Sequence, residues 1–364
     1  MALSCGIVGL PTVGKTTFFN LLTNANVETS AFYSGKTSTN MGTALVPDER
    51  VDFLSRMFHP KKTTYAQIEV IDVPGLVKGS SQGQGTGNEF LSAVRDTDAL
   101  VHIVRAFENK QVLHVDNSLD IMRDLETVNM ELLFSDLQLI ETRLARINSG
   151  KKKKMENPLE ETVLLKIQEV LENEQPVSTI SFSQEEREAI KHITFLTDKP
   201  MLIVVNLDEK QFSANSYPQK EAVHAFGKDH QMKVMEICAQ VEAEISQLEP
   251  EDKQLFMEDL GIKEAGIDRL AKAIYDLLGL ISFLTAGEDE VKAWTIKKGL
   301  PAKKAAGKIH SDIERGFIRA EVVAYQDLKK AGSMAKAREL GLFRLEGKDY
   351  PVQDGDIINF RFNV

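Results

Sequence analysis

The residues of this chain that can bind phosphate lie together near its N-terminus, in the segment Gly9-Leu10-Pro11-Thr12-Val13-Gly14-Lys15-Thr16. An apolar, strand-like run precedes this segment and a helix-like run follows it. In that setting the pattern GxxxxGK[ST] indicates a loop whose backbone N–H groups wrap phosphates. We expect Lys15 to reach the β- and γ-phosphates of a nucleotide and the Thr16 hydroxyl to bind Mg²⁺. The remaining nucleotide-binding positions expected here are Thr12, Val13, Gly14 and Thr17.

A second motif, Asp72-Val73-Pro74-Gly75, follows directly on an apolar run. In phosphate-transferring proteins of this type we expect such an aspartate near Mg²⁺ and such a glycine amide near the γ-phosphate. Further glycines downstream favour a mobile switch segment over a simple turn; they are Gly79, Gly83, Gly85 and Gly87. A plain glycine-rich surface loop is the alternative interpretation.

A third motif, Asn206-Leu207-Asp208-Glu209, stands where the residues that read the base belong. GTPases carry Asn-Lys-x-Asp there, and the aspartate accepts two hydrogen bonds from guanine. Glu209 replaces that aspartate, and its extra methylene displaces the carboxylate, so tight discrimination for guanine is not expected and ATP becomes plausible. Leu207 can still pack on the base in place of the lysine stem. The alternative is that these residues form only a helix-initiating turn.

Short apolar runs position these motifs, at residues 3–9, 68–73, 99–104, 201–205 and 233–237, and they alternate with helix-like stretches. The alternation predicts an α/β fold with a doubly wound parallel sheet. The stretch between the third and fourth runs is far longer than a crossover helix needs, which indicates an insertion. Two apolar stripes, at 121–147 and 163–171, predict an antiparallel helical hairpin there, and 183–186 is a capping box that begins a further helix.

The sequence pattern changes after a predicted helix at 267–278. From there on, short runs of alternating apolar and polar residues are separated by turns that contain Gly and Asp. The runs at 281–285, 291–296, 317–325 and 357–362 predict a small mixed sheet in a second, α+β domain. The predicted domains are therefore a nucleotide-binding domain at 1–117 and 199–279, a helical insertion at 118–198 and a C-terminal domain at 280–364.

Composition limits the class of protein. Apolar residues make up 42% of the 364 residues and charged residues 27%, and no apolar run is long enough to cross a bilayer, so we expect no membrane contact. The N-terminus lacks the basic start of a signal peptide, and Cys5 and Cys238 have no metal-ligand spacing, which favours reduced thiols and a cytoplasmic protein. A net charge of −10 argues against coating of nucleic acid by the whole surface, so any such contact must be local.

The ordered motifs resemble the YchF, or Obg-like ATPase, family of translation-factor-related proteins. The resemblance covers the whole chain and extends to 74–79, 107–109, 241–245, 344–350 and 360–364. It implies a P-loop NTPase domain of Obg type, an inserted coiled coil and a C-terminal TGS domain, which is β-grasp-like. It also implies preference for ATP over GTP, with Mg²⁺, and binding to the ribosome.

Two positions depart from the family pattern. The family has an asparagine where this chain has Thr12, and in related NTPases such an asparagine helps to hold K⁺, so stimulation by K⁺ stays open. The family's switch threonine, a second Mg²⁺ ligand, aligns with Lys36, and Thr37 lies one residue further on. Thr37 can serve as the ligand after a small shift of the loop, or Lys36 can meet the γ-phosphate.

The catalytic group is not set by the phosphate motifs alone. Leu76 stands where Ras-like enzymes have a glutamine that orients the attacking water, and leucine cannot form that hydrogen bond. His114 matches a histidine regarded as catalytic in the family and can orient water, with Lys15 as the other catalytic group; a purely structural histidine is the alternative. We expect slow ATP hydrolysis to ADP and phosphate in a translation- or stress-related switch.

Other functions remain open at this stage. One is a GTP-dependent, nucleic-acid-binding GTPase, and another is a nucleotide-gated scaffold with negligible turnover. The expected partners are ATP and the ribosome, in particular its large subunit and its RNA, with the chain a monomer or weak oligomer. We expect these contacts at the lysines of 151–154 and at the basic stretch around Lys297, Lys298, Lys303, Lys304 and Lys308.

Overall fold

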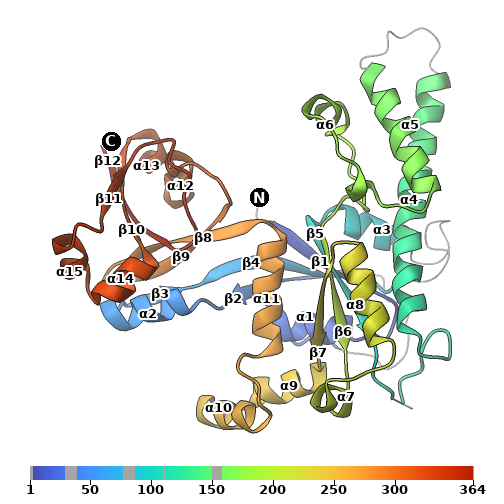
Figure 1. Ribbon diagram of the computed structural model, residues 1–364, viewed down its shortest axis with the longest axis horizontal. Coiled ribbons are helices and arrows are strands. Elements are labelled where there is room, and N and C mark those ends of the chain that lie inside the picture. The colour runs from blue at the N-terminus through green and yellow to red at the C-terminus, as the bar shows by residue number, and fades with distance from the viewer. Residues whose placement is uncertain (1–2, 29–38, 77–86, 110, 150–157, 364) are drawn as a thin grey trace. The chain divides into compact units, whose positions relative to one another are not determined.

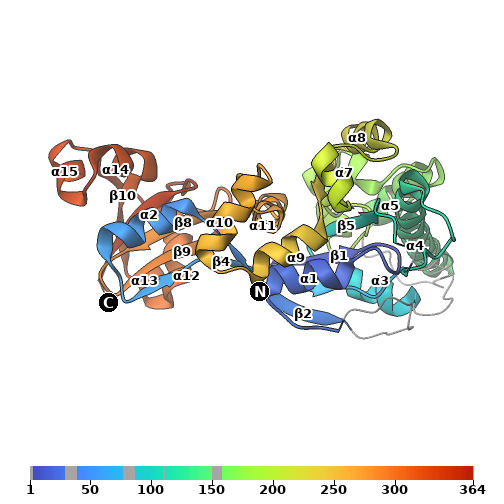
Figure 2. The ribbon, with the colours of Figure 1, turned by 90° about the horizontal axis from the view of Figure 1, so that it is seen from below.

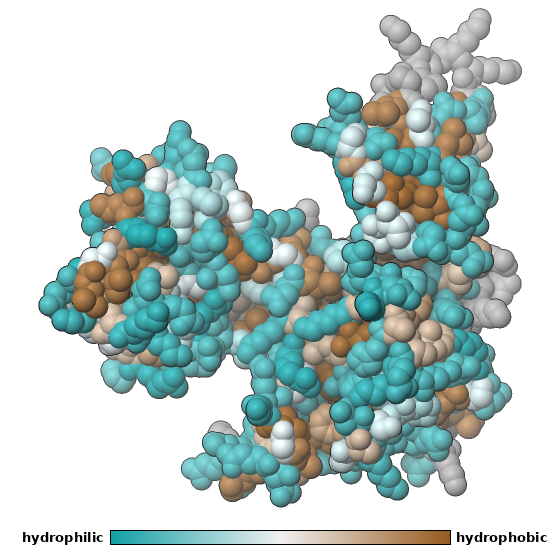
Figure 3. All heavy atoms as spheres, viewed as in Figure 1, coloured by the Kyte–Doolittle hydropathy of each residue, from teal (hydrophilic) through white to brown (hydrophobic). Residues whose placement is uncertain are grey.

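The computed structural model describes residues 3–28, 39–76, 87–109, 111–149 and 158–363. The chain divides into two compact units, which are described separately below. The first contains Met1–Gly42 and Glu69–Ile267, and the second contains Thr43–Ile68 and Asp268–Val364. No described helix is long and apolar enough to cross a membrane, and the face shown in Figure 3 is largely hydrophilic.

A six-stranded sheet in the order β2-β4-β1-β5-β6-β7 forms the centre of the first unit, although the end of β2 (from Thr43) and the start of β4 (to Ile68) are assigned to the second unit. The strands are β1 Ser4–Val8, β2 Asn40–Val46, β4 Ala66–Asp72, β5 Ala99–Arg105, β6 Met201–Asn206 and β7 Lys233–Ile237. β1 pairs in parallel with β4 and β5, and β5, β6 and β7 continue the parallel sheet. The predicted α/β fold is therefore confirmed.

Every residue of β1, β5 and β6 is buried, which explains why these strands are mostly apolar. His102 and Arg105 of β5 are buried polar exceptions. In Figures 1 and 2, helix α1 (Lys15–Thr23) lies beside α9 (Ala239–Gln247) on one side of the strands, and α3 (Gly87–Arg95) and α8 (Lys220–Asp229) lie on the other, as right-handed crossovers require. The short helix α7 (Glu209–Ala214) follows β6. The sheet is thus covered on both faces. The carboxyl ends of parallel strands meet at one edge, which brings together the motifs that follow β1, β4 and β6.

The predicted helical hairpin is present, and α4 (Ile121–Ser149) and α5 (Pro158–Glu172) lie side by side in Figure 1. Their shared core contains Leu133, Ile140, Leu144, Val163, Leu164, Ile167 and Leu171. A short 3-10 turn, Val177–Thr179, leads to α6 (Gln184–Ile190). The capping box that begins α6 is confirmed, since the Ser183 side chain and Glu186 exchange hydrogen bonds with each other's backbone N–H. The lysines of 151–154 lie outside the described residues.

The second unit contains a sheet in the order β11-β10-β12-β8-β9-β3. Its strands are β3 Lys62–Thr64, β8 Leu280–Ala286, β9 Glu290–Lys297, β10 Phe317–Ala324, β11 Arg344–Glu346 and β12 Asp356–Phe362. Its helices are α2 Glu49–Phe58, α12 Ala302–Ile309, α13 Ser311–Arg315, α14 Tyr325–Ala331 and α15 Met334–Glu339. Figure 1 shows α12 and α13 on one side of this sheet and α2 and α14 on the other. The four predicted C-terminal strands are present, except that Tyr325 begins α14.

Residues 43–68 belong to the second unit, whereas the sequence analysis placed them in the nucleotide-binding domain. β3 pairs in parallel with β9, with Lys62 opposite Glu290. Arg50, just inside α2, donates a 2.7 Å hydrogen bond to Asp354. The residues in each of these contacts lie far apart in the sequence, so no local sequence pattern predicts the contacts. The remaining helices are α10 Pro250–Asp259 and α11 Gly266–Leu277, which joins the two units in sequence.

Candidate functional site

The loop between β1 and α1 has the conformation that the phosphate-binding pattern predicts. Gly14, at the N-cap of α1, has φ 106°, and a Cβ atom there would lie 2.6 Å from the side-chain amide of Asn206. Gly9 has φ 146°, and a Cβ atom there would lie 2.4 Å from the carbonyl oxygen of Ile103. Only glycine fits these two positions, so the sequence ends the strand and begins the helix with a tight, largely buried turn, of which Thr12, Gly14 and Thr16 are partly exposed.

Lys15 is buried within this loop, with 8% of its surface exposed. Its ammonium group donates to the carbonyl oxygens of Gly9 (3.1 Å) and Leu10 (2.8 Å). Burial lowers the pKa of Lys15 to about 8, and the nearby Asp72 opposes that shift. A cation held only by neutral carbonyl groups gains from a charged acceptor, so Lys15 is suited to bind phosphate oxygens.

Thr16 and Asp72 form an oxygen-rich pair beside Lys15. The Thr16 hydroxyl donates to Asp72 Oδ2 at 2.9 Å, and Asp72 is 6% exposed. Asp72 Oδ1 is buried and has no hydrogen-bond partner among the described residues. Burial raises the pKa of Asp72, while Thr16, Lys15 and the Asn40 side chain act in the opposite direction. A buried, unsatisfied carboxylate oxygen next to a hydroxyl is the donor set that Mg²⁺ takes, so both residues fit the predicted metal site.

The start of the predicted switch segment lies on the phosphate loop. The Leu76 N–H donates to the Gly9 carbonyl at 3.2 Å, and a Cβ atom on Gly75 would lie 3.1 Å from the Pro11 ring. The Leu76 side chain is fully buried, so it takes no part in orienting water. The rest of the segment, as well as Lys36 and Thr37, lies outside the described residues.

Asn206, which begins the predicted base-reading motif, is hydrogen-bonded to the phosphate loop. Its side-chain amide donates to the Val13 carbonyl at 3.0 Å, and its Oδ1 accepts from the Ala239 N–H at 3.2 Å. Asn206 is 4% exposed, so this crosslink is buried. It joins the ends of β1, β6 and β7 and fixes the loop that includes Cys238.

The three residues after Asn206 have different environments: a buried side chain, a helix cap and an exposed carboxylate. Leu207 is 3% exposed and packs into the core with Val104 and Val205. Asp208 caps α7, because its carboxylate accepts from the Gln211 N–H at 2.9 Å. The helix-initiating interpretation is therefore correct for Asp208, and Glu209 provides the exposed carboxylate next to it.

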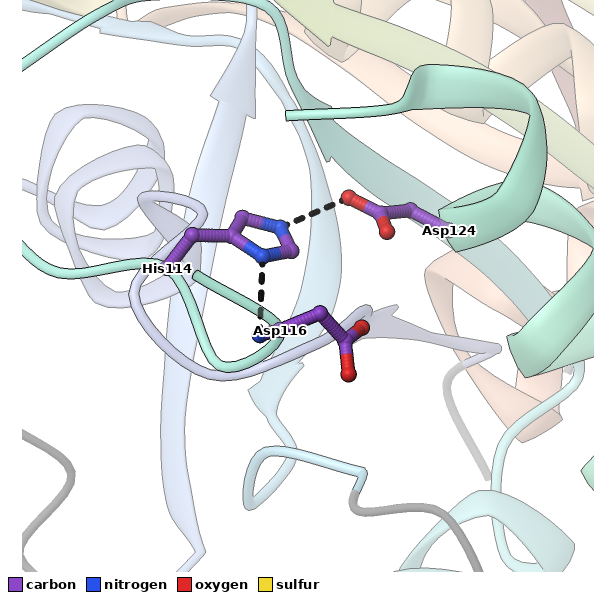
Figure 4. A group of neighbouring side chains, drawn as sticks. All are labelled: His114, Asp116 and Asp124. Carbon is purple, nitrogen blue, oxygen red and sulfur yellow. Dashed lines mark hydrogen bonds and ion pairs between the residues drawn. The ribbon is translucent and has the colours of Figure 1, made fainter. Parts of the chain in front are cut away.

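His114 does not point its ring into solvent. Its Nδ1 accepts from the Asp116 N–H at 3.1 Å, which leaves the proton on Nε2, and Nε2 donates to Asp124 Oδ2 at 2.8 Å (Figure 4). Arg123 donates to the other Asp124 oxygen at 2.9 Å. Ligand atoms of His114, Asp116 and Asp124 lie within 4.8 Å of one another. Since Nδ1 and both Asp124 oxygens already have partners, we interpret this group as a hydrogen-bond network.

The structure thus brings together Lys15, Thr16, Asp72 and Asn206, and holds the His114 ring on α4. It also reveals residues that the sequence analysis missed. The Thr12 hydroxyl donates to the Leu113 carbonyl at 3.1 Å, which links the phosphate loop to the segment that carries His114. Asp124 is next in sequence to Leu125 of the apolar stripe, and both residues are buried. Because carboxylates are seldom buried without a partner, an aspartate beside a predicted buried residue could have indicated a polar contact here.

Known proteins resemble this chain over its full length. Residues 4–136 match a family described as 50S ribosome-binding GTPase, and residues 280–363 match YchF-GTPase_C, described as a protein of unknown function. Proteins named ribosome-binding ATPase YchF share 46% identity in Bacillus subtilis (strain 168) over 366 residues and 41% in Escherichia coli O157:H7 over 365, with 100% of both chains covered in each case.

A solved structure supports the same relationship. The Schizosaccharomyces pombe YchF GTPase has a TM-score of 0.85 and 32% sequence identity, and the match covers 99% of this chain and 98% of that one. The relatives match in length, in sequence and in fold, and the chain therefore belongs to the YchF family.

Proposed function

We propose that this protein binds ATP with Mg²⁺ and hydrolyses it to ADP and phosphate while it associates with ribosomes. The observation that carries the phosphate chemistry is the buried Thr16–Asp72 pair next to Lys15. Thr16 and Asp72 would hold Mg²⁺, directly or through water, and the metal would neutralise charge on the β- and γ-phosphates. Lys15 binds the same phosphates, and the backbone N–H groups of residues 12–17 surround them.

ATP is the favoured nucleotide because the chain lacks the carboxylate that reads guanine. Glu209 stands at the position of that aspartate, and its longer side chain displaces the carboxylate. Asp208, the residue before it, caps α7. Relatives at 46% and 41% identity carry the name ATPase, which agrees with this assignment.

Paired binding measurements test the nucleotide preference. Dissociation constants of Mg²⁺ complexes of non-hydrolysable ATP and GTP analogues should differ at least about tenfold in favour of ATP, a difference that one well-placed polar contact supplies. Glu209→Asp provides the matched variant, and it should narrow the difference by strengthening GTP binding. Equal affinities, or tighter GTP binding by the wild type, would contradict the proposed preference for ATP.

Catalysis needs a group other than Leu76, and His114 is the proposed one. In the structure its two ring nitrogens are bound to Asp116 and Asp124, so His114 has to leave Asp124 before it can orient water. Thr12 replaces an asparagine of the family pattern, and in related NTPases such an asparagine helps to hold K⁺. We therefore expect the same turnover in KCl and in NaCl of equal concentration.

The ribosome assignment rests on the relatives' names and on exposed lysines of the second unit. Lys297, Lys298, Lys303, Lys304 and Lys308 are all exposed, at the end of β9 and along α12. We propose that they meet RNA phosphates on the large subunit, with the chain acting as a monomer in the cytoplasm. Lys303→Glu with Lys308→Glu should reduce co-sedimentation with ribosomes and its salt dependence, whereas unchanged binding would exclude this face.

A further inference from the structure

The His114 ring has no free nitrogen in this structure. A neutral imidazole offers one donor and one acceptor, and here the Asp116 N–H and the Asp124 carboxylate occupy both. The side chains of His114 and Asp124 are 4% and 1% exposed, so the pair is also closed to solvent. A histidine in this position can neither accept a proton from water nor donate one to a phosphate.

Asp124 is itself held in place. It lies in the first turn of α4, where the helix dipole favours a negative charge. Arg123 grips the oxygen that His114 does not use, through Nε at 3.1 Å and Nη2 at 2.9 Å. Arg123 therefore fixes the Asp124 carboxylate independently of His114, and the hydrogen bond between the imidazole and the carboxylate is charge-assisted.

The segment around His114 is ordered by polar contacts and not by apolar burial. Leu113 and Val115 are 63% and 42% exposed, while the polar side chain between them is buried. This is the reverse of the usual preference. At the other end of the segment, the Leu113 carbonyl accepts from Thr12, a β-branched residue in the left-handed region at φ 61°. The segment is held by hydrogen bonds, which also include one from Arg105 to the Val112 carbonyl at 3.0 Å, so a change in its conformation would bury or expose little apolar surface.

We propose that Asp124 is a positioning residue that stores His114 in a withdrawn state, so that ATP cleavage waits for His114 to leave Asp124. This rests on the proposed catalytic role of His114. The Thr12 contact joins the stored segment to the phosphate loop, which couples nucleotide binding to release of the histidine. In the opposite arrangement, Asp124 would hold one ring nitrogen of His114 during the reaction while the other ring nitrogen bound the attacking water. That arrangement requires a free ring nitrogen, and here Asp116 and Asp124 occupy both.

Single-turnover cleavage of saturating Mg²⁺–ATP tests the proposal. Asp124→Asn keeps the shape of the side chain but removes the charge, and it should speed cleavage about threefold to tenfold by weakening one charge-assisted hydrogen bond. Asp116→Asn is the matched control: it removes a neighbouring charge that faces Arg123 but keeps the backbone N–H, and the rate should stay within about twofold. His114→Ala should slow cleavage at least about tenfold, and adding Asp124→Asn should not restore it.

The outcomes separate the two proposals. If His114→Ala leaves the rate unchanged, His114 is not catalytic and the proposed mechanism fails. If His114→Ala slows cleavage but Asp124→Asn slows it too or has no effect, only the storage role is wrong. Arg123→Gln is a second variant, for use if Asp124→Asn does not fold, and should speed cleavage by a smaller factor.

A spectroscopic signature gives a readout apart from activity. Nitrogen-15 spectra of the histidine rings, with His114 assigned by its loss in His114→Ala, should show Nε2 protonated and Nδ1 unprotonated in the nucleotide-free protein. Binding of a Mg²⁺–ATP analogue and the Asp124→Asn change should each shift these signals. Signals that are the same in all three samples would show that Asp124 does not hold the ring.

Discussion

Lys15 combines a positive charge with nearly complete burial, and this makes its proton part of nucleotide binding. Burial brings its pKa to about 8 in the free protein. A bound triphosphate favours the charged form, so the pKa in the complex is higher than in the free protein. By linkage, affinity is fully present below about pH 8 and is lost as the pH rises through the free-protein pKa, by up to about tenfold per pH unit.

Titration of a non-hydrolysable ATP analogue between about pH 7 and pH 9.5 checks this prediction. ATP and Mg²⁺ concentrations stay fixed, and Lys15→Gln serves as the control, because it should bind weakly with no such dependence. Constant affinity of the wild type up to about pH 9.5 would mean that the lysine keeps an ordinary pKa in the loop.

The positions of side chains were predictable where they follow from the local pattern. Lys15 and Thr16 lie where their motif places them, in the loop and helix after β1, and Asp72 is the last residue of the neighbouring β4, so the three meet at the same edge of the sheet. The Asn206 crosslink and the Asp124 contact were not predictable, since their partners come from other segments. The assignments of nucleotide, metal and catalytic residues remain predictions, and Thr37 lies outside the described residues.

At the scale of elements, the hairpin of α4 and α5 depends on a continuous apolar core. Ile167 on α5 is fully buried in that core, whereas Leu165, two positions away on the same helix, is 51% exposed. Ile167→Ala should lower the free energy of unfolding by about 2–5 kcal/mol, because it removes buried methyl groups and leaves a cavity. Leu165→Ala should change it by less than about 0.5 kcal/mol.

Urea unfolding followed by circular dichroism measures both variants. ATP affinity should be the same in each, since the hairpin core contains none of the nucleotide-binding residues. An equal loss of stability for the two changes would show that Leu165 is covered in solution.

Elements with a strong periodic signal were predictable, and short ones were not. The buried strands β1, β5 and β6 and the stripes of α4 and α5 were found because burial on two faces, or along one stripe, leaves a clear pattern. β3 and β11 are three residues each and carry mostly polar or charged side chains, so they form only because a neighbouring strand offers its edge.

At the scale of the whole molecule, the segment 43–68 completes the second unit through Arg50. Its guanidinium group donates to Asp48 at 2.8 Å and to Asp354 at 2.7 Å, and Asp354 also accepts from the Ser282 N–H. Arg50→Ala should lower the free energy of unfolding by about 1–3 kcal/mol, since it leaves the largely buried Asp48 carboxylate without this partner.

The control is Lys61→Ala, which breaks an ion pair between Lys61 and Asp289. The side chains of these two residues are 81% and 88% exposed. That pair should contribute less than about 1 kcal/mol. Thermal melting of the full chain compares the variants, and a loss for Lys61→Ala as large as for Arg50→Ala would contradict the assigned role of Arg50. The predicted domain boundaries did not anticipate this segment, because Arg50 and Asp354 are 304 positions apart.

Residues 43–68 also constrain how this protein is made. A translating ribosome releases β3 and α2 long before it polymerises β9, with which β3 pairs through Thr63 and Val291. Until then Val51 and Leu54, which are fully buried in the finished protein, have no completed sheet to pack against. A chain that stops before residue 268 keeps that helix uncovered, so prematurely terminated products should be sticky and open to proteases even where their phosphate loop has already formed.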